Sequence, residues 1–203
     1  MADFQFHADF NTITPRLEAA VGRVILEWAV IDDCITQLCH TFWCEAHPND
    51  AVPRPFDKRS KAAKSFAKIM YLDRLKEPDE WVTFAWYIQR LRNLNDKRDD
   101  IAHGHPGRIT VAGKSFDGLM IPRPWRKTRF EKQSLSDIEQ LGEDLRRIRA
   151  ETLEVSYAFY QAHAASSPNK QAWQDQNGWK QVTKENRSPK LPRWNVPPPT
   201  FQP

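Results

Sequence analysis

An arginine and a histidine five positions apart are the residues of this chain whose types and spacing best suit chemistry. Arg98 carries a permanent charge and a planar fork of donors that matches a phosphate, whereas the imidazole of His103 is of the type that transfers protons in catalysis. Cleavage of RNA by its own 2′-hydroxyl needs both functions, because a proton must move and a pentacoordinate phosphorus must be stabilised. Arg98 and His103 are therefore the candidate catalytic pair.

Polar residues around this pair supply further candidates. Asp99 follows the arginine directly and is grouped with the catalytic residues. His105 fits a slightly longer spacing from Arg98 and is the second choice for the histidine role. A structural reading stays open, in which Arg98 pairs with Asp99 or Asp100 and the histidine caps a helix end. The supporting or alternative candidates are His105, Asn95, Asp100 and Asp32, the last of which lies on an earlier helix and could hold Arg98, or could be solvated together with Asp33.

The spacing of the pair constrains how it could act. Positions 98 and 103 lie about 140° apart on an ideal helix, so one helix does not easily aim both side chains at one phosphate. Two arrangements remove the difficulty. Either the helix ends at Ala102 and frees His103, or a second copy of the chain supplies the other half of the site.

Residues 98–104, with the sequence RDDIAHG, resemble the signature of the HEPN superfamily: an arginine, a polar residue, three variable residues and a histidine. The resemblance implies a small helical bundle and a metal-independent endoribonuclease, often a toxin or a defence effector such as one directed against phage. It also implies a homodimer in which both Arg/His pairs line one cleft, with RNA as substrate and an antitoxin or other protein as a possible partner. Arg98 and His103 would be catalytic, and Asp99 would fill the polar position.

The chain departs from the family pattern at two positions. Family members more often have asparagine where Asp99 stands, and a carboxylate there could pair with Arg98 and weaken its hold on phosphate. A non-catalytic module that binds a nucleotide, RNA or a protein partner is therefore the alternative. His105 replaces the tyrosine that one toxin subgroup carries two residues after the histidine, so antitoxin control through that tyrosine is not implied.

The elements that must position these residues read as four helices. Apolar residues recur every three or four positions from an N-cap at Thr14 to His47, from about Asp57 or Ser60 to Leu75, from Pro78 to the candidate site, and from Ser136 to about His163. Ser136 and Glu139 form a capping box for the last helix. Residues 108–111 and 119–121 have strand composition and predict a hairpin that turns at 112–114 or at 117–118. We expect an all-α fold, a four-helix HEPN-like bundle with a small β-hairpin between the third and fourth helices.

Composition divides the chain into three parts: a loose lead-in over residues 1–13, the bundle over 14–165, and a basic tail over 166–203 that is rich in proline and tryptophan. The tail holds six bases and two acids, whereas the preceding residues have 24 of each, so the net charge of +4 belongs to the tail. With little apolar material besides four large aromatic residues, the tail is expected to be disordered.

The remaining sequence features bear on location and cofactors. No secretory signal or membrane-length apolar run is visible, and three cysteines within one predicted helix indicate reduced thiols, so we expect a cytoplasmic protein without membrane contact. His40, Cys44 and His47 share a helical face near Cys39, but no second ligand pair with zinc-like spacing accompanies them. We expect neither a metal nor a cofactor.

Overall fold

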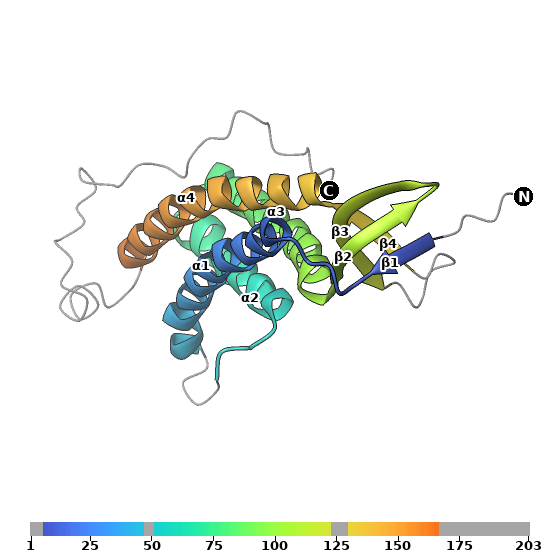
Figure 1. The fold of residues 1–203 in the computed structure, drawn as a ribbon. Coiled ribbons are helices and arrows are strands. Elements are labelled where there is room, and N and C mark those ends of the chain that lie inside the picture. Colours follow the sequence, from blue (N-terminus) through green and yellow to red (C-terminus); the bar gives the residue numbers. More distant parts are fainter. Residues whose placement is uncertain (1–5, 47–50, 123–129, 167–203) are drawn as a thin grey trace, which may run out of the picture. The chain divides into compact units, whose positions relative to one another are not determined.

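The computed structural model describes residues 6–46, 51–122 and 130–166. The chain divides into two compact units. One, here called the sheet unit, comprises Met1–Val30 and Asn93–Arg149, and the other, the aromatic unit, comprises Ile31–Arg92 and Ala150–Pro203. Helices account for 73% of the described residues. The elements in chain order are β1 (Phe6–Asp9), α1 (Pro15–Ala46), α2 (Phe56–Lys68), the π-helix η1 (Ile69–Arg74), α3 (Pro78–His103), β2 (His105–Val111), β3 (Lys114–Pro122), β4 (Phe130–Ser134) and α4 (Leu135–Ser166) (Figure 1).

The sheet unit contains an antiparallel sheet with the strand order β1-β2-β3-β4. Strands β2 and β3 form the expected hairpin, and its turn lies at Ala112 and Gly113, both of which have positive φ angles of 49° and 76°. Two consecutive residues of this kind match the twist of a tight hairpin. The alternative turn at 117–118 is excluded, because Asp117 pairs with Arg108 inside the ladder.

Two further strands make the sheet larger than the sequence indicated. β1 adds to β2 with Ala8 opposite Ile109, and β4 adds to β3 with Lys132 opposite Met120. The expectation of a loose lead-in is therefore wrong for residues 6–9, and all-α holds only roughly: the described fold is mostly helical, with four α-helices and a four-stranded sheet. Short segments such as β1 have too few residues to show a period, and pairing with β2 determines their conformation.

The cap of helix α4 lies two residues earlier than predicted, at Ser134, and the helix begins at Leu135. Ser134 and Asp137 form the capping box: the Asp137 amide donates to Ser134 Oγ at 3.3 Å, and the Ser134 amide donates to Asp137 Oδ2 at 2.9 Å. The Ser134 hydroxyl, which donates to Asp137 Oδ2 at 2.7 Å, and then the Ser134 amide hold the pKa of Asp137 below its usual value. The prediction of Ser136 as the N-cap is wrong, because the same pattern of a hydroxyl and an acid three positions apart occurs in both registers. At α1 the expected cap is confirmed, since the Leu17 amide donates to Thr14 Oγ1 at 3.3 Å.

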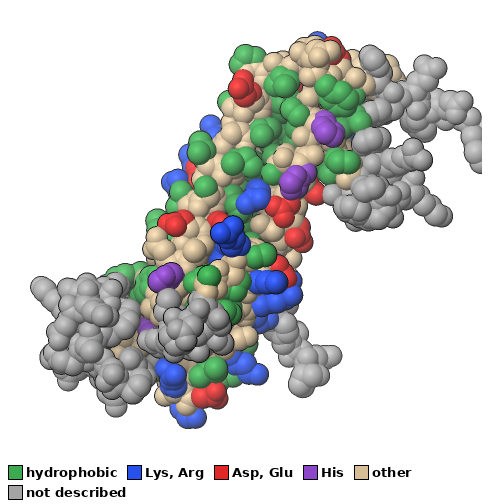
Figure 2. All heavy atoms as spheres, turned by 90° about the horizontal axis from the view of Figure 1, so that it is seen from below, with side chains coloured by type: hydrophobic (Ala, Val, Ile, Leu, Met, Phe, Trp, Pro, Cys, Tyr) green, Lys and Arg blue, Asp and Glu red, His purple; other side chains and the backbone are tan. Residues whose placement is uncertain are grey.

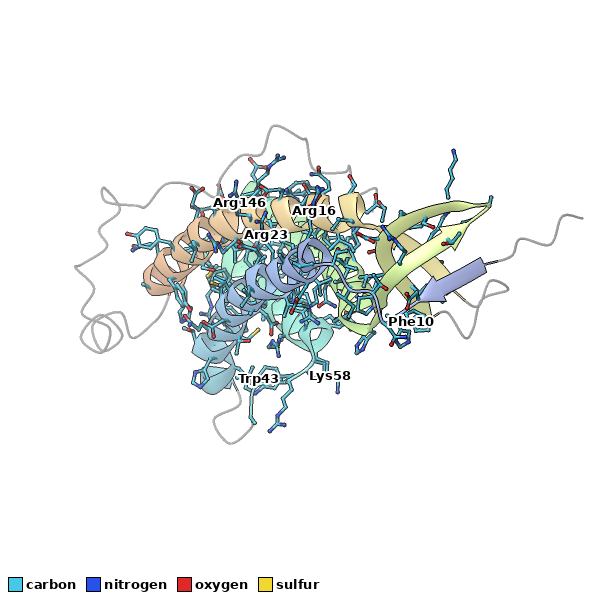
Figure 3. The ribbon with its side chains drawn as sticks, viewed as in Figure 1. Phe10, Arg16, Arg23, Trp43, Lys58 and Arg146 are labelled. Atoms are coloured by element: carbon cyan, nitrogen blue, oxygen red, sulfur yellow. The ribbon has the colours of Figure 1, made fainter. Side chains whose placement is uncertain are left out.

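Ion pairs join α1 and α4 along the sheet unit. Arg16 Nε lies 2.7 Å from Glu139 Oε1, and Arg23 Nη1 lies 3.0 Å from Glu143 Oε1. Arg146 reaches the same Glu143, so three arginines follow this pair of helices (Figure 3). The partners are largely exposed and each pair stabilises little. The main stabilisation comes from the apolar side chains buried in this unit, which include Leu17, Val24, Trp28, Ile101, Ile109, Leu119, Ile138 and Leu145.

The aromatic unit is built around stacked and tilted rings. Phe42 stacks on Phe66 with their centroids 4.1 Å apart, and Phe159 contacts both rings as well as Phe84. The Tyr87 hydroxyl donates to Thr152 Oγ1 at 2.5 Å, and burial raises the pKa of this tyrosine. Ile69–Arg74, expected as part of the last turns of an α-helix, form the π-helix instead.

Charge on the described surface is mixed. On the face shown in Figure 2, basic and acidic side chains are interspersed, as the balanced count before residue 166 leads one to expect. Any attraction for an anionic partner must therefore be local. No helix in the described ranges is long and apolar enough to span a bilayer. The predicted tail, residues 167–203, lies outside the described part.

Candidate functional site

The site is carried by the last two turns of α3, where the helix has to stop. Gly104 follows His103, and its amide donates to the Ile101 carbonyl at 3.3 Å, which tightens the final turn. A Cβ at Gly104 would lie 3.0 Å from the Asp100 carbonyl oxygen and 3.2 Å from Leu119 Cβ on β3. The chain therefore passes from helix to sheet at a position where a side chain would crowd its neighbours. Of the two arrangements considered from the sequence, the one in which the helix ends at Ala102 is wrong, because α3 includes His103.

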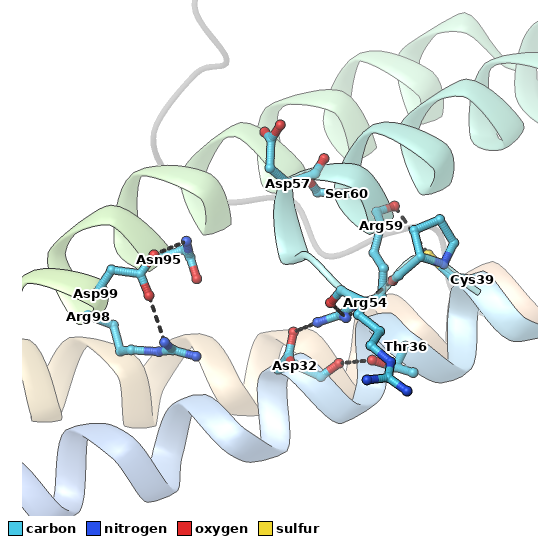
Figure 4. A network of polar contacts seen from close by, with 11 residues as sticks. Asp32, Thr36, Cys39, Arg54, Asp57, Arg59, Ser60, Asn95, Arg98 and Asp99 are labelled. Carbon is cyan, nitrogen blue, oxygen red and sulfur yellow. Dashed lines mark hydrogen bonds and ion pairs between the residues drawn. The ribbon is translucent and has the colours of Figure 1, made fainter. Parts of the chain in front are cut away.

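Arg98 is held on two sides within the sheet unit. Its Nη1 donates to Asp99 Oδ1 at 2.6 Å (Figure 4). Its guanidinium carbon lies 5.4 Å from the centre of the Trp28 ring. The Arg98 side chain is 26% exposed, and its Nε is buried without a hydrogen-bond partner among the described residues. The guanidinium is thus fixed by a carboxylate and an aromatic face, and one of its donors is left unused.

Asp99 belongs to a short chain of hydrogen bonds. Asn95, one turn earlier on α3, donates from Nδ2 to Asp99 Oδ2 at 3.0 Å while Asp99 Oδ1 accepts from Arg98 (Figure 4). Both carboxylate oxygens are therefore occupied, although the side chain keeps 45% of its exposure. Asn95 and Arg98, two polar residues near the end of α3, therefore share Asp99 as a hydrogen-bond partner.

The two candidate histidines lie on either side of Gly104. His103 is the last residue of α3 and His105 is the first residue of β2, and both are exposed. The His105 ring meets Phe10 edge to face, with their centroids 5.8 Å apart. His103 is still part of the helix, so its side chain is not released by an earlier helix end. On an ideal helix it therefore points about 140° away from Arg98, as predicted.

Asp32 makes a contact other than the one expected for it. In the aromatic unit its Oδ1 pairs with Arg59 Nη2, and Arg59 is buried, with 7% of its surface exposed (Figure 4). Arg59 also donates to the carbonyls of Pro53 and Arg54, so it links α1 to the segment before α2. The role of holding Arg98 belongs to Asp99, and Asp32 is a structural partner of Arg59. Asp33 accepts from Gln37 at 2.7 Å, and Asp100, also on α3, is half-buried.

Trp28 and Phe10 are the neighbours of the site that sequence reasoning missed. Trp28 was assigned to the apolar stripe of α1, which is correct, since 1% of its surface is exposed. Nothing in the stripe distinguishes a tryptophan that supports an arginine from one that only fills the core. Phe10 lay in a segment without a period, and only the pairing of β1 with β2 brings it to His105.

Metal-binding candidates are sparse in this chain. Within the described ranges, no group of three or more histidine, cysteine or acidic side chains is placed to hold a metal ion. Cys39 donates to the Arg59 carbonyl at 3.2 Å, and burial raises its pKa to about 12, so it remains a thiol. His47 lies outside the described residues, and of the Cys44 side chain nothing is described.

Comparisons with models of known protein families, with curated protein sequences and with solved structures found no match for this chain.

Proposed function

We propose that this protein is a metal-independent endoribonuclease of the HEPN type, acting as a homodimer in which Arg98 and His103 from two copies meet at one RNA phosphate. The observation that carries the proposal is that both residues fall within the last six positions of α3, where the helix ends against Gly104. A permanent cation and an exposed imidazole at one helix terminus are the two groups that this reaction requires.

The held guanidinium suits the binding of a phosphate. Stacking on Trp28 and pairing with Asp99 limit the motion of Arg98, so less conformational entropy is lost when an anion binds. Arg98 would stabilise the negative charge that accumulates on the phosphorane oxygens.

The reaction needs one imidazole for proton transfer. His103 would take the proton from the 2′-hydroxyl while the 2′-oxygen forms its bond to phosphorus, and would return it to the 5′-oxygen as the phosphorus–oxygen bond breaks. The products are a 2′,3′-cyclic phosphate and a free 5′-hydroxyl, and no water or metal enters the balance. Because Arg98 and His103 diverge on one helix, a second copy is the source of the opposite member of the pair.

Cleavage in the presence of a chelator tests the proposal. Purified full-length protein should cut RNA in EDTA and leave cyclic phosphate ends, and Arg98→Ala and His103→Ala should each reduce cleavage at least about a hundredfold, the scale of a lost acid–base group or charge stabiliser. Lys58→Gln, which removes a charge from the exposed face of α2, should leave cleavage unchanged. Cleavage that requires added metal, or that survives both substitutions, would contradict the proposal.

One observation favours a second candidate, a module that binds RNA, a nucleotide or a protein partner without turnover. Asp99 already neutralises Arg98 at 2.6 Å, and this pair would have to open or be shared before the arginine could stabilise a transition state. Binding by the wild-type protein without any cleavage, weakened by Arg98→Ala, would select this candidate. A protein that stays monomeric while it binds would favour it too, because a shared cleft requires two copies.

A further inference from the structure

The two faces of the sheet differ in charge. Residues opposite one another in an antiparallel ladder share a face, and residues two apart along a strand do as well. The register therefore places the three acids described in the sheet on a single face: Asp9 and Asp117 flank Arg108, and Glu131 lies opposite Ile121. Thr14, the cap of α1, donates to Asp117 at 3.2 Å, so this acidic face turns toward the helices of its own unit.

The other face carries cations and aromatic rings and, among the described side chains, no acid. His105, Met120 and Lys132 form one row across β2, β3 and β4, with His105 and Lys132 exposed and Met120 buried between them. Lys114, also exposed, lies on this face of β3. At a strand spacing of about 4.8 Å, His105 and Lys132 are roughly 10 Å apart. We call this surface, defined by His105, Gly107, Lys114, Phe116, Gly118 and Lys132, the basic sheet face.

Two aromatic rings flank a pair of glycines on the basic sheet face. Gly107 and Gly118 lie opposite one another, so neither strand places a side chain there. A Cβ at Gly107 would lie 2.5 Å from the Asp9 carbonyl oxygen and 3.1 Å from Phe10 Cα, and one at Gly118 would lie 2.2 Å from the Gln133 carbonyl oxygen and 3.4 Å from the Phe116 ring. Backbone of the neighbouring strands therefore fills both positions, and the rings lie beside them. Phe10 is 45% exposed beside His105 (Figure 3), and the Lys132 ammonium lies 5.6 Å from the centre of the Phe116 ring.

We propose that the basic sheet face binds a single-stranded segment of RNA, with bases against Phe10 and Phe116 and phosphates against Lys114 and Lys132. One exposed ring (Phe10) and one half-buried ring (Phe116) are interleaved here with cations. This combination suits an unpaired strand, because every base has a face that stacks and every linkage has a charge. A duplex buries its bases and would leave the rings unused. The acid-free face favours an anionic partner over a neutral or basic peptide.

The inference rests on the proposed function for its purpose, which is to lead the substrate to the scissile position. Only Gly104 separates His103 from His105, so the basic sheet face begins where the candidate catalytic histidine ends. Sequence preference would then arise from the bases stacked on this face and not from the Arg/His pair. The substrate class that follows is single-stranded RNA, such as a loop or an unpaired end.

Binding to cleavage-deficient protein tests the inference separately from catalysis. Full-length Arg98→Ala protein is titrated into a labelled single-stranded RNA of 12 nucleotides and into the same sequence as a duplex, with fluorescence anisotropy as the readout at several salt concentrations. Phe10→Ala should weaken single-strand binding at least about fivefold, the lower end for one stacked base. Lys114→Gln with Lys132→Gln should reduce the steepness of the salt dependence by about 1.4, the value for two phosphate contacts to a single strand.

The control is Lys58→Gln, which should change neither quantity. Equal affinity for the duplex, no binding by the Arg98→Ala protein, or losses no larger than those of the control would overturn the inference. So would binding of a peptide or protein at this face in preference to RNA. If the wild-type protein never cuts RNA but the basic sheet face binds it as described, the proposed nuclease function fails and this inference stands. If the protein cuts RNA and substitutions on the basic sheet face change neither binding nor cleavage, the nuclease function stands and this inference fails.

Discussion

Removing the charge of Asp99 should make the protein a better nuclease. Asp99 lies 2.6 Å from the Arg98 guanidinium and competes with phosphate for it, while Asp99→Asn keeps an oxygen that can accept from Asn95 or Arg98. The two side chains are 26% and 45% exposed, so the pair belongs with ion pairs open to solvent, which contribute about 0.2–1 kcal/mol. Releasing that competition corresponds to roughly a 1.4- to 5-fold gain.

The assay is kcat/KM on a short fluorogenic RNA at low ionic strength, with EDTA present. Asp96→Asn is the matched control, because Asp96 is an exposed acid on the same helix. This substitution also removes one negative charge, but at a side chain that makes no described contact with Arg98. The kcat/KM of Asp99→Asn should be higher than that of both the wild type and the control, and the difference should shrink as the salt concentration rises. A fall of tenfold or more in Asp99→Asn would refute the reasoning, since it would show that the carboxylate itself takes part in the reaction.

Three further predictions concern stability and reactivity. Ser134→Ala should lower the free energy of unfolding by about 1 kcal/mol through loss of the α4 cap. The Ser134 hydroxyl also holds the pKa of Asp137 below its unfolded value of about 4. In urea melts the loss of stability relative to wild type should therefore be complete above pH about 4 and should shrink as the pH falls through the pKa of Asp137 in the folded protein. Arg59→Ala should destabilise by about 3 kcal/mol, the low end for a broken buried pair since Asp32 stays 31% exposed, and a loss no larger than that of the exposed pair variant Arg92→Ala would contradict the buried-clamp role. Cys39 should resist alkylation at pH 8 in native protein and react on unfolding, as followed by peptide mass spectrometry, because burial raises its pKa to about 12; labelling in the native state at the rate of an unfolded thiol would be inconsistent with that burial.

Regular apolar spacing was enough to locate the helices, because each long stripe must be buried. The stripe from Leu17 to Phe42 and the one ending at Leu91 are buried as expected, and the proline starts of α1 and α3 lie at Pro15 and Pro78. The sheet was predicted only in part. β1 and β4 lack a period of their own and exist through pairing with β2 and β3, which is a long-range property that local pattern does not contain.

The candidate site shows the same division. The sequence left open a pairing of Arg98 with Asp99 or Asp100, and the structure shows the pair with Asp99. Asp32 was a candidate for the same role, with solvation beside Asp33 as the open alternative. It is paired with Arg59 instead, a residue that no spacing rule had linked to it across 27 positions. The separation of acids and cations between the two sheet faces likewise depends on a register that the hairpin sequence left open between two turns.

The claim on which the account depends is that one scissile phosphate needs Arg98 from one copy and His103 from another. Mixing purified Arg98→Ala and His103→Ala proteins, unfolding and refolding them together, and measuring RNA cleavage in EDTA tests this most directly. Each variant alone should be inactive, and the mixture should recover about a quarter of wild-type activity, because half of randomly paired dimers are mixed and each has one intact site of two. A mixture as inactive as its components would contradict the account.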